Sequence, residues 1–92
     1  MKSYASIDRI ERKWAVCEVE LLPIEESKTE DFAIKDTVMI DVLLAQFPSR
    51  LGRVNTGDIL VVEHDGENVS MVYYKDEEER VRRIELLRRM WS

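Results

Sequence analysis

Apolar and polar residues alternate along this chain with a period that changes once, near residue 76. Before that point apolar residues recur every second position over short runs, which predicts β-strands. After it they recur every three or four positions, which predicts a helix. The predicted strands span residues 4–10, 14–21, 37–42, 59–64 and 68–74. The pattern therefore predicts a mainly β domain that ends in one amphipathic α-helix.

The same alternation predicts which strand residues face the core, because successive side chains of a strand point to opposite faces. The core-facing sets of the second and third strands are expected to be Ala15, Cys17, Val19 and Leu21, and then Val38, Ile40 and Val42. The opposite sets are Trp14, Val16, Glu18 and Glu20, and then Thr37, Met39 and Asp41. Residues 43–47 lose the alternation, so they are expected to form a short helical turn that carries Leu44 and Phe47 into the core.

Turn residues separate the predicted strands. The charged residues 11–13 are expected to close an opening hairpin, and Asp8 and Arg9 are expected to point to opposite faces and not to pair with each other. After Pro23, the polar residues 25–31 are interpreted as a surface loop. Asp65 and Gly66 predict a β-hairpin with a type I′ turn.

Five short antiparallel strands and one helix predict a small, partly open β-barrel, SH3-like or OB-like, that the amphipathic helix covers. The 92 residues are enough for one domain, in which residues 1–75 form the barrel and 76–92 the helix. The alternation leaves the strand order open, because sandwiches and both kinds of barrel share it.

The terminal helix begins with recognisable capping residues. Asp76 is the predicted N-cap, and Glu79 follows at the spacing of a capping box. Glutamates fill the first turn and arginines the last, which suits the helix dipole. Three pairs have the favourable i,i+4 order, Glu78/Arg82, Glu79/Arg83 and Glu85/Arg89. One face is apolar and needs a partner surface, and its residues are Val81, Ile84, Leu87, Met90 and Trp91.

The charge of the chain argues against two classes of partner. The net charge is -5, and residues 1–75 carry all of it, with 14 acidic and 9 basic side chains, whereas residues 76–92 hold 5 of each. An acidic barrel disfavours nucleic acid and anionic membranes, although Tyr4, Trp14, Tyr73 and Tyr74 are candidates for stacking on bases. No run of apolar residues is long enough to span a membrane, and no export signal is recognisable. A cytoplasmic location is expected.

Residues that could carry chemistry are few. Cys17 is the single cysteine, so no internal disulfide or multi-cysteine zinc site is expected, and it is expected to be buried and unreactive. His64 is the single histidine, and a structural or solvent-exposed role is expected. Four carboxylates, those of Glu18, Glu20, Asp41 and Glu63, are candidates for an outer face that could hold a divalent cation, but solvated surface charges are the favoured interpretation. We expect no enzyme, no catalytic residue, no cofactor and no metal.

The order of several short runs resembles a known family. These runs are residues 7–11, 15–20, 40–42, 47–48 and 57–60, followed by a tail rich in glutamate and arginine that ends in Met90 and Trp91. Together they resemble the bacterial domain of unknown function 3006 over nearly the whole chain, with longer segments at 22–36 and 49–56. The resemblance implies the small β fold and a bacterial origin, and it implies no catalytic residue.

The sequence favours a protein-binding or self-association role, including a homodimer, in which the apolar helix face and its rim form the contact. The competing interpretation is that this face packs entirely on its own barrel. The alternative function is weak binding of a small ligand or divalent cation on the acidic sheet face.

Overall fold

The computed structural model describes residues 1–29 and 36–91. Its five strands are β1 (Lys2–Glu11), β2 (Trp14–Glu20), β3 (Thr37–Leu43), β4 (Ile59–His64) and β5 (Val69–Lys75). Its helices are α1 (Ile24–Thr29) and α2 (Glu77–Trp91), with two short 3-10 turns, η1 (Leu44–Gln46) and η2 (Ser49–Leu51), between β3 and β4. The predicted mainly β fold with a C-terminal helix is confirmed.

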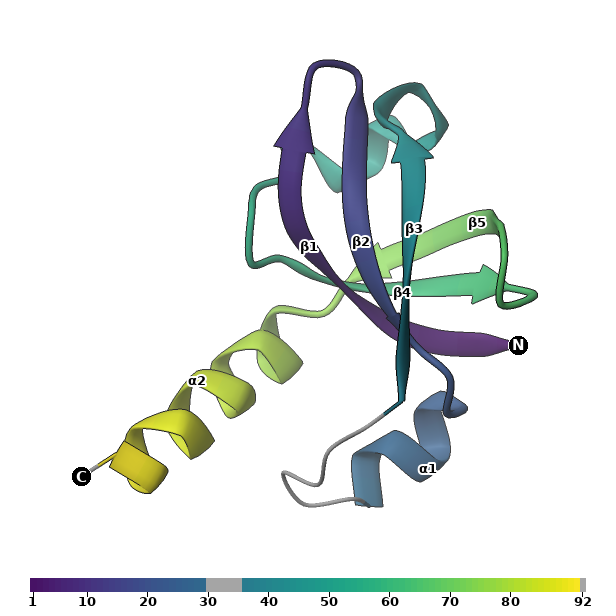
Figure 1. Cartoon of the computed structure of the whole chain (residues 1–92). Coiled ribbons are helices and arrows are strands. Elements are labelled where there is room, and N and C mark those ends of the chain that lie inside the picture. The colour runs from purple at the N-terminus through teal and green to yellow at the C-terminus, as the bar shows by residue number, and fades with distance from the viewer. Residues whose placement is uncertain (30–35, 92) are drawn as a thin grey trace.

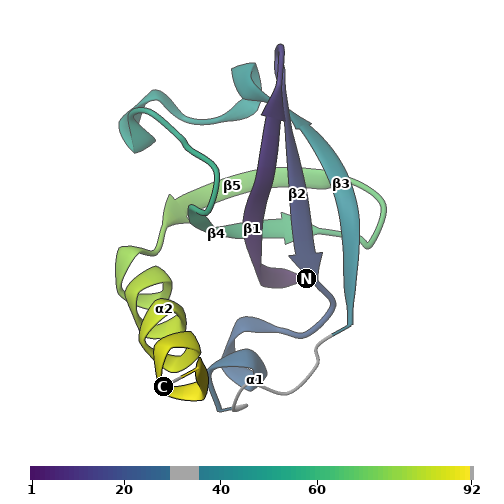
Figure 2. The same ribbon diagram turned by 60° about the vertical axis from the view of Figure 1, so that its left-hand side comes forward.

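All neighbouring strands pair antiparallel in the order β3-β2-β1-β4-β5. The first three strands follow one another, and the chain then returns through η1 and η2 to place β4 on the other side of β1, which is a Greek-key connection. Figures 1 and 2 show β4 and β5 crossing the direction of the other three strands. Because β3 and β5 remain the two edges, the barrel is partly open, and its Greek-key order fits the OB-like alternative.

β1 joins the two halves of the barrel. Its first half pairs with β4 through residues 2–6, and its second half pairs with β2 through residues 5–11. A bulge between Ile7 and Arg9 lies where β1 leaves β4, and such an extra residue bends a strand. Asp8 and Arg9, predicted to diverge, instead form an ion pair at 2.8 Å, because the bulge interrupts the alternation.

The barrel interior holds the main core. Eleven buried residues form it, contributed by all five strands, and Val38, Leu44, Phe47, Leu51 and Val54 pack against them. The predicted inward set is confirmed for Ala15, Cys17, Val19, Ile40 and Val42, and the turn at η1 brings Leu44 and Phe47 to the core as predicted. Leu21 was predicted to face the core, but it lies just beyond β2 and is exposed.

A second, smaller core lies on the outer face of β1 and β4. It contains Tyr4, Ile24, Ile59 and Val61, so that β4 is buried on both sides. Ile24 is the first residue of α1, which continues into the stretch interpreted above as a loop. That prediction is wrong for residues 25–29, and residues 30–31 lie outside the described part of the chain. Pro23 and the two glutamates that follow Ile24 are typical of a helix start, and they could have indicated α1.

The hairpin between β4 and β5 forms as predicted, but its turn is of another type. Among the residues of this turn, Gly66 alone has a positive φ, of 90°, whereas a type I′ turn requires a positive φ at both central residues. The side chain of Asp65 instead accepts hydrogen bonds from the amides of Glu67 and Asn68, at 2.9 and 2.7 Å. These bonds hold the pKa of Asp65 below its usual value and close a four-residue loop.

Candidate interaction surface

α2 leaves the barrel directly after β5 and projects away from it (Figure 1). The amide of Asp76 donates to the carbonyl of Ile59 at 2.8 Å, which ties the start of the helix to β4. Asp76 is the N-cap as predicted, since its Oδ1 accepts the amide of Glu79 at 2.9 Å. The reciprocal half of the predicted capping box is absent, because the amide of Asp76 is used by Ile59 and the carboxylate of Glu79 binds arginines.

One guanidinium fixes α2 on the barrel. Arg83 binds Glu20 at the end of β2 at 2.9 Å and Glu79 on its own helix at 2.7 Å. It also lies over the ring of Tyr4, with 5.1 Å between its Cζ and the ring centroid. The hydroxyl of Tyr4 donates to Asp76 at 3.3 Å. We call these five residues the helix anchor.

Burial makes the helix anchor costly to break, because removing one partner leaves a buried charge poorly compensated. Glu20 and Glu79 are 6% and 5% exposed, although charged residues are rarely buried unless they are paired. Burial alone would raise the pKa of Glu79, but the hydrogen bonds from Arg82 and Arg83 outweigh it and hold this pKa below its usual value. Burial, with Asp76 and Glu79 nearby, raises the pKa of Tyr4, which therefore stays protonated. The sequence predicted that Glu20 is a solvated residue on the outer face of the sheet. That prediction is wrong, because Glu20 is buried and binds Arg83.

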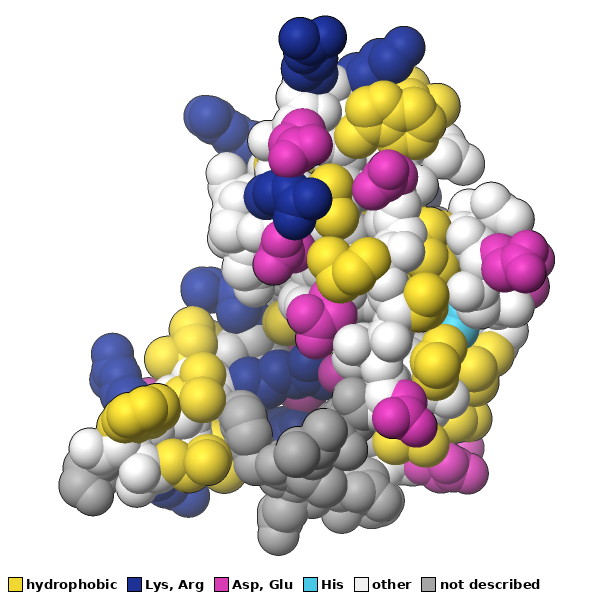
Figure 3. Space-filling view, in the orientation of Figure 1, with side chains coloured by type: hydrophobic (Ala, Val, Ile, Leu, Met, Phe, Trp, Pro, Cys, Tyr) yellow, Lys and Arg dark blue, Asp and Glu magenta, His cyan; other side chains and the backbone are white. Residues whose placement is uncertain are grey.

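Beyond the helix anchor, α2 is poorly covered. Glu79 is the one buried residue of the helix. All residues of the predicted apolar face are exposed: Val81 50%, Ile84 38%, Leu87 42%, Met90 64% and Trp91 85%. Figure 3 shows apolar side chains gathered on the projecting helix. The expectation that α2 covers the barrel is thus met only at its first turns, and the outer face of β1 and β4 is covered by Ile24 of α1.

The predicted ion pairs along α2 are rearranged. Glu79/Arg83 forms as expected, whereas Arg82 donates twice to Glu79, three residues before it, and both bonds are 2.7 Å long. Glu77 binds Arg80 at 3.1 Å, and Glu85 lies 3.8 Å from Arg88. These two outer pairs are exposed, so each stabilises the helix only slightly.

The four outer carboxylates do not gather into one site. Glu18 and Asp41 are exposed on β2 and β3, Glu20 belongs to the helix anchor, and Glu63 binds the ammonium group of Met1. Within residues 1–29 and 36–91, no group of three or more histidine, cysteine or acidic side chains could hold a metal ion.

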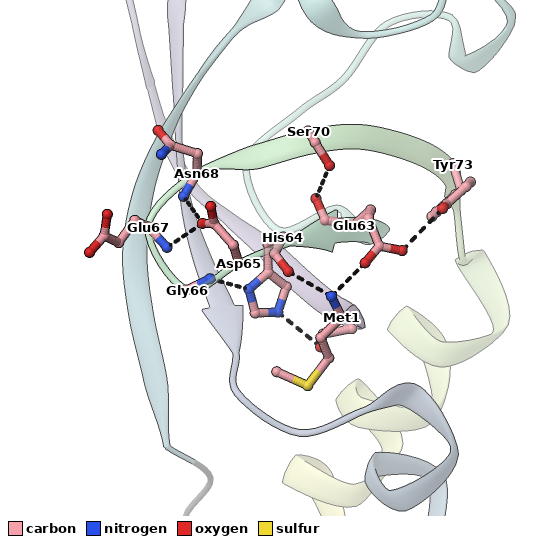
Figure 4. Close-up of polar contacts among 10 residues, drawn as sticks. Met1, Glu63, His64, Asp65, Gly66, Glu67, Asn68, Ser70 and Tyr73 are labelled. Atoms are coloured by element: carbon pink, nitrogen blue, oxygen red, sulfur yellow. Dashed lines mark hydrogen bonds and ion pairs between the residues drawn. The ribbon is translucent and has the colours of Figure 1, made fainter.

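His64 lies in a second polar cluster, at the β4–β5 turn (Figure 4). The amide of Gly66 donates to its Nδ1 at 3.0 Å, so the proton of the neutral ring is on Nε2, which lies 3.0 Å from the hydroxyl of Ser3. Burial lowers the pKa of His64, and the ring is 2% exposed. This arrangement supports the predicted structural role, since both ring nitrogens serve the fold.

Glu63 extends the same cluster toward solvent. Besides the ammonium group of Met1, its carboxylate accepts the hydroxyl of Tyr73 at 3.2 Å (Figure 4). The ammonium group holds the pKa of Glu63 below its usual value.

Cys17 is buried in the barrel, as predicted, and burial raises its pKa to about 11, so the thiol stays protonated near neutral pH.

An open groove of about 440 Å³ lies between the tip of β1 and the connector that follows β3. Its lining includes the apolar side chains of Ile10, Leu44, Phe47 and Val54, together with Arg53. Of the four aromatic residues considered for stacking on bases, Tyr4 is buried under Arg83, whereas Trp14 and Tyr74 are exposed. These two exposed rings are on β2 and β5, and neither lines the groove.

None of the helices in the described residues is long and apolar enough to cross a membrane. No protein-family model, no curated protein and no solved structure matches this chain. The resemblance to the bacterial domain of unknown function 3006 therefore stays a prediction.

Proposed function

We propose that this protein is a non-catalytic interaction module whose contact surface is the apolar face of α2. The supporting observation is that the five residues of this face are 38% to 85% exposed, although they form one continuous apolar stripe. Large exposed apolar patches on a folded protein mark binding sites or aggregation hazards, because their hydration is unfavourable.

The helix anchor supports this role. It fixes the base of α2 through Glu20, Arg83 and Tyr4 while none of the five apolar residues is used in it. A helix that is already oriented loses less conformational entropy when it binds than a free segment would. Tryptophan and methionine, which end the stripe, are enriched at the centres of protein interfaces.

A divalent-cation site receives less support. Two of its four candidate carboxylates, Glu20 and Glu63, bind positively charged groups of the chain itself. The remaining pair, Glu18 and Asp41, offers too few oxygen ligands for Ca²⁺.

The test is photo-crosslinking in the native cell with a photoreactive phenylalanine analogue in place of Leu87. We expect a defined covalent adduct, whatever its mass, which is lost when the same chain also carries Ile84→Gln and Trp91→Gln. The matched control has the analogue in place of Met39, which is 49% exposed on β3. No adduct from position 87, or equal adducts from both positions, would overturn the proposal.

A further inference from the structure

We infer that the groove beside the tip of the β1–β2 hairpin binds an acidic peptide segment of a partner protein, with apolar side chains between its carboxylates. This site is separate from the apolar face of α2, because the hairpin tip and α2 lie at opposite ends of the molecule (Figures 1 and 2). Three observations support the inference: the apolar lining of the groove, a local excess of positive charge, and a preformed shape.

The lining of the groove suits apolar side chains. Ile10, Leu44, Phe47 and Val54 line it, and each of them remains at least partly exposed. Apolar groups that cover them would gain about 25 cal/mol per Å² removed from water. The groove has a volume of about 440 Å³ and is open, whereas sites for small molecules enclose most of the ligand's surface. An open apolar groove therefore fits a peptide segment better than a small ligand.

The surroundings of the groove are basic although the chain is acidic. Residues 42–57, which supply most of the lining, contain Arg50 and Arg53 and no acidic residue. The hairpin tip adds Arg12 and Lys13, and Figure 3 shows lysine and arginine side chains at this tip. The rest of the chain holds 10 basic and 19 acidic side chains. Positive charge is thus concentrated at one end of an otherwise acidic molecule.

These four positive charges are not neutralised by the fold. None of them forms an ion pair within residues 1–29 and 36–91, whereas Arg9 on the same hairpin binds both Asp8 and Glu11. Arg50 donates to the carbonyl of Tyr73 at 2.8 Å, and a carbonyl carries no net charge. Carboxylates of a partner would complement this field, and the acidic remainder of the chain would direct an acidic segment to this end.

Hydrogen bonds hold the groove in shape on both sides. The amide of Leu44 donates to the carbonyl of Lys13 at 2.9 Å, which ties the connector after β3 to the hairpin tip. The ammonium group of Lys75 donates to the carbonyl of Arg53 at 2.9 Å, which ties the same connector to β5. This ammonium group also lies 4.0 Å from Asp58, so it offsets the nearest acidic residue of the connector. A preformed groove loses little conformational entropy when it binds.

Other polyanions fit these observations less well. Phe47 is the one aromatic residue among the described residues that line the groove, and Trp14 and Tyr74 lie outside it, so bases would find little to stack on. A long nucleic acid or an anionic membrane would also face the acidic remainder of the chain, which repels it. A short acidic segment needs to contact only the basic end.

The first test selects peptides of about eight residues, roughly 26 Å long when extended, from a random displayed library on the immobilised chain. Counter-selection uses the Arg53→Glu variant. We expect the peptides that bind only the wild type to be rich in aspartate and glutamate around one or two apolar residues. An empty set, or a set without an excess of acidic residues, would overturn the inference.

Fluorescence anisotropy with a labelled selected peptide then measures the part played by charge. Arg53→Glu and Lys13→Glu should each weaken binding by about tenfold, because each replaces a positive charge by a negative one. Arg88→Glu makes the same change in charge on α2, where the side chain is 75% exposed, and should leave binding unchanged. Equal losses in the Arg53 and Arg88 variants would show unspecific attraction and would overturn the site.

The apolar lining has its own matched pair of variants. Ile10→Gln should weaken binding without unfolding the chain, since Ile10 is already 37% exposed. Met39→Gln, at a side chain 49% exposed on β3, should have no effect on binding. Circular dichroism checks that both variants are folded. Unchanged binding in the folded Ile10 variant would contradict the use of the groove.

Two further outcomes would assign the binding elsewhere. If a labelled oligothymidylate binds more tightly than the selected peptide and is lost in the Arg53→Glu variant, the groove takes nucleic acid and the peptide is overturned. If every selected peptide is instead lost with Ile84→Gln and Trp91→Gln, the peptides bind α2. The groove is then overturned, and the proposed function remains.

Discussion

Arg83 is the residue on which the placement of α2 depends. Its guanidinium binds Glu20 and Glu79 and lies over Tyr4, and its Nη2 has no hydrogen-bond partner among the described residues. Contact with the aromatic face partly compensates such an atom. Two buried carboxylates therefore share this cation, although Glu79 also binds Arg82 and Glu20 also accepts the hydroxyl of Ser27.

Replacing Arg83 by Met should lower the free energy of unfolding by about 3 kcal/mol, because it removes the guanidinium from two buried carboxylates and leaves Arg82 as the remaining arginine on Glu79. Arg88→Met removes an equal charge from an exposed site and should change this free energy by less than about 0.5 kcal/mol. Urea unfolding followed by circular dichroism measures both. Equal effects of the two substitutions would contradict the role given to the helix anchor.

His64 should make stability depend on pH. Burial lowers the pKa of His64 in the folded chain below the value of about 6.5 that it has in the unfolded chain. At pH values between these two pKa values, His64 is protonated in the unfolded chain and neutral in the folded chain. Stability should therefore fall as pH falls through this window, by at most about 1.4 kcal/mol per pH unit.

The comparison is urea unfolding of the wild type and His64→Gln at pH values above and below 6.5. The variant retains a donor for Ser3 and cannot titrate, so its curve should be flatter. Parallel curves for the two proteins would show that other groups control this dependence.

At the residue scale, alternation predicted the barrel-facing residues of β2 and β3, but it missed Val16, which was placed on the outer face and is 6% exposed, and the buried charges. Glu20 has the position of an outward residue, and it is buried because α1 and α2 close over it with Ser27 and Arg83. Asp8 and Arg9 were misassigned because a bulge breaks the period. Both errors arise from contacts between distant segments, to which a local pattern is insensitive.

At the scale of elements, the hydrogen bonds of Asp76 fix the start of α2. Asp76 caps the helix with one carboxylate oxygen and accepts Tyr4 with the other, while its amide binds β4. The capping residue was recognisable in the sequence, because the cap is a local interaction. The bond to Tyr4 was not, because 72 positions separate the two residues.

Asp76→Ala should lower the free energy of unfolding by about 1 to 2 kcal/mol, since it removes both the cap and the acceptor of Tyr4. Glu78→Ala, in the same turn but exposed, is the matched control. Thermal unfolding recorded by circular dichroism compares them. A smaller effect of the Asp76 substitution than of the control would show that the junction is held by backbone contacts alone.

At the scale of the whole molecule, the chain combines an acidic barrel with an electroneutral helix whose five apolar-face residues are exposed. We therefore expect folding to depend on the barrel core and the helix anchor, and not on the apolar face of α2. Stability and association should respond to different substitutions.

The double variant with Leu87→Gln and Trp91→Gln should unfold in dilute solution within about 0.5 kcal/mol of the wild type, because neither side chain is buried. Leu60→Ala, in the barrel interior, should cost about 2 to 5 kcal/mol. A large loss of stability in dilute solution would show that the apolar face packs within its own chain.

The sequence by itself determined the five strands, the terminal helix with its cap, and most of the barrel interior, because these depend on local periodicity and turn chemistry. Only the tertiary structure decided the Greek-key order, the burial of Glu20, the covering role of α1 and the exposure of the apolar face of α2. Strand order and burial depend on which distant segments meet, and an amphipathic pattern shows that a helix has an apolar face without showing what covers it.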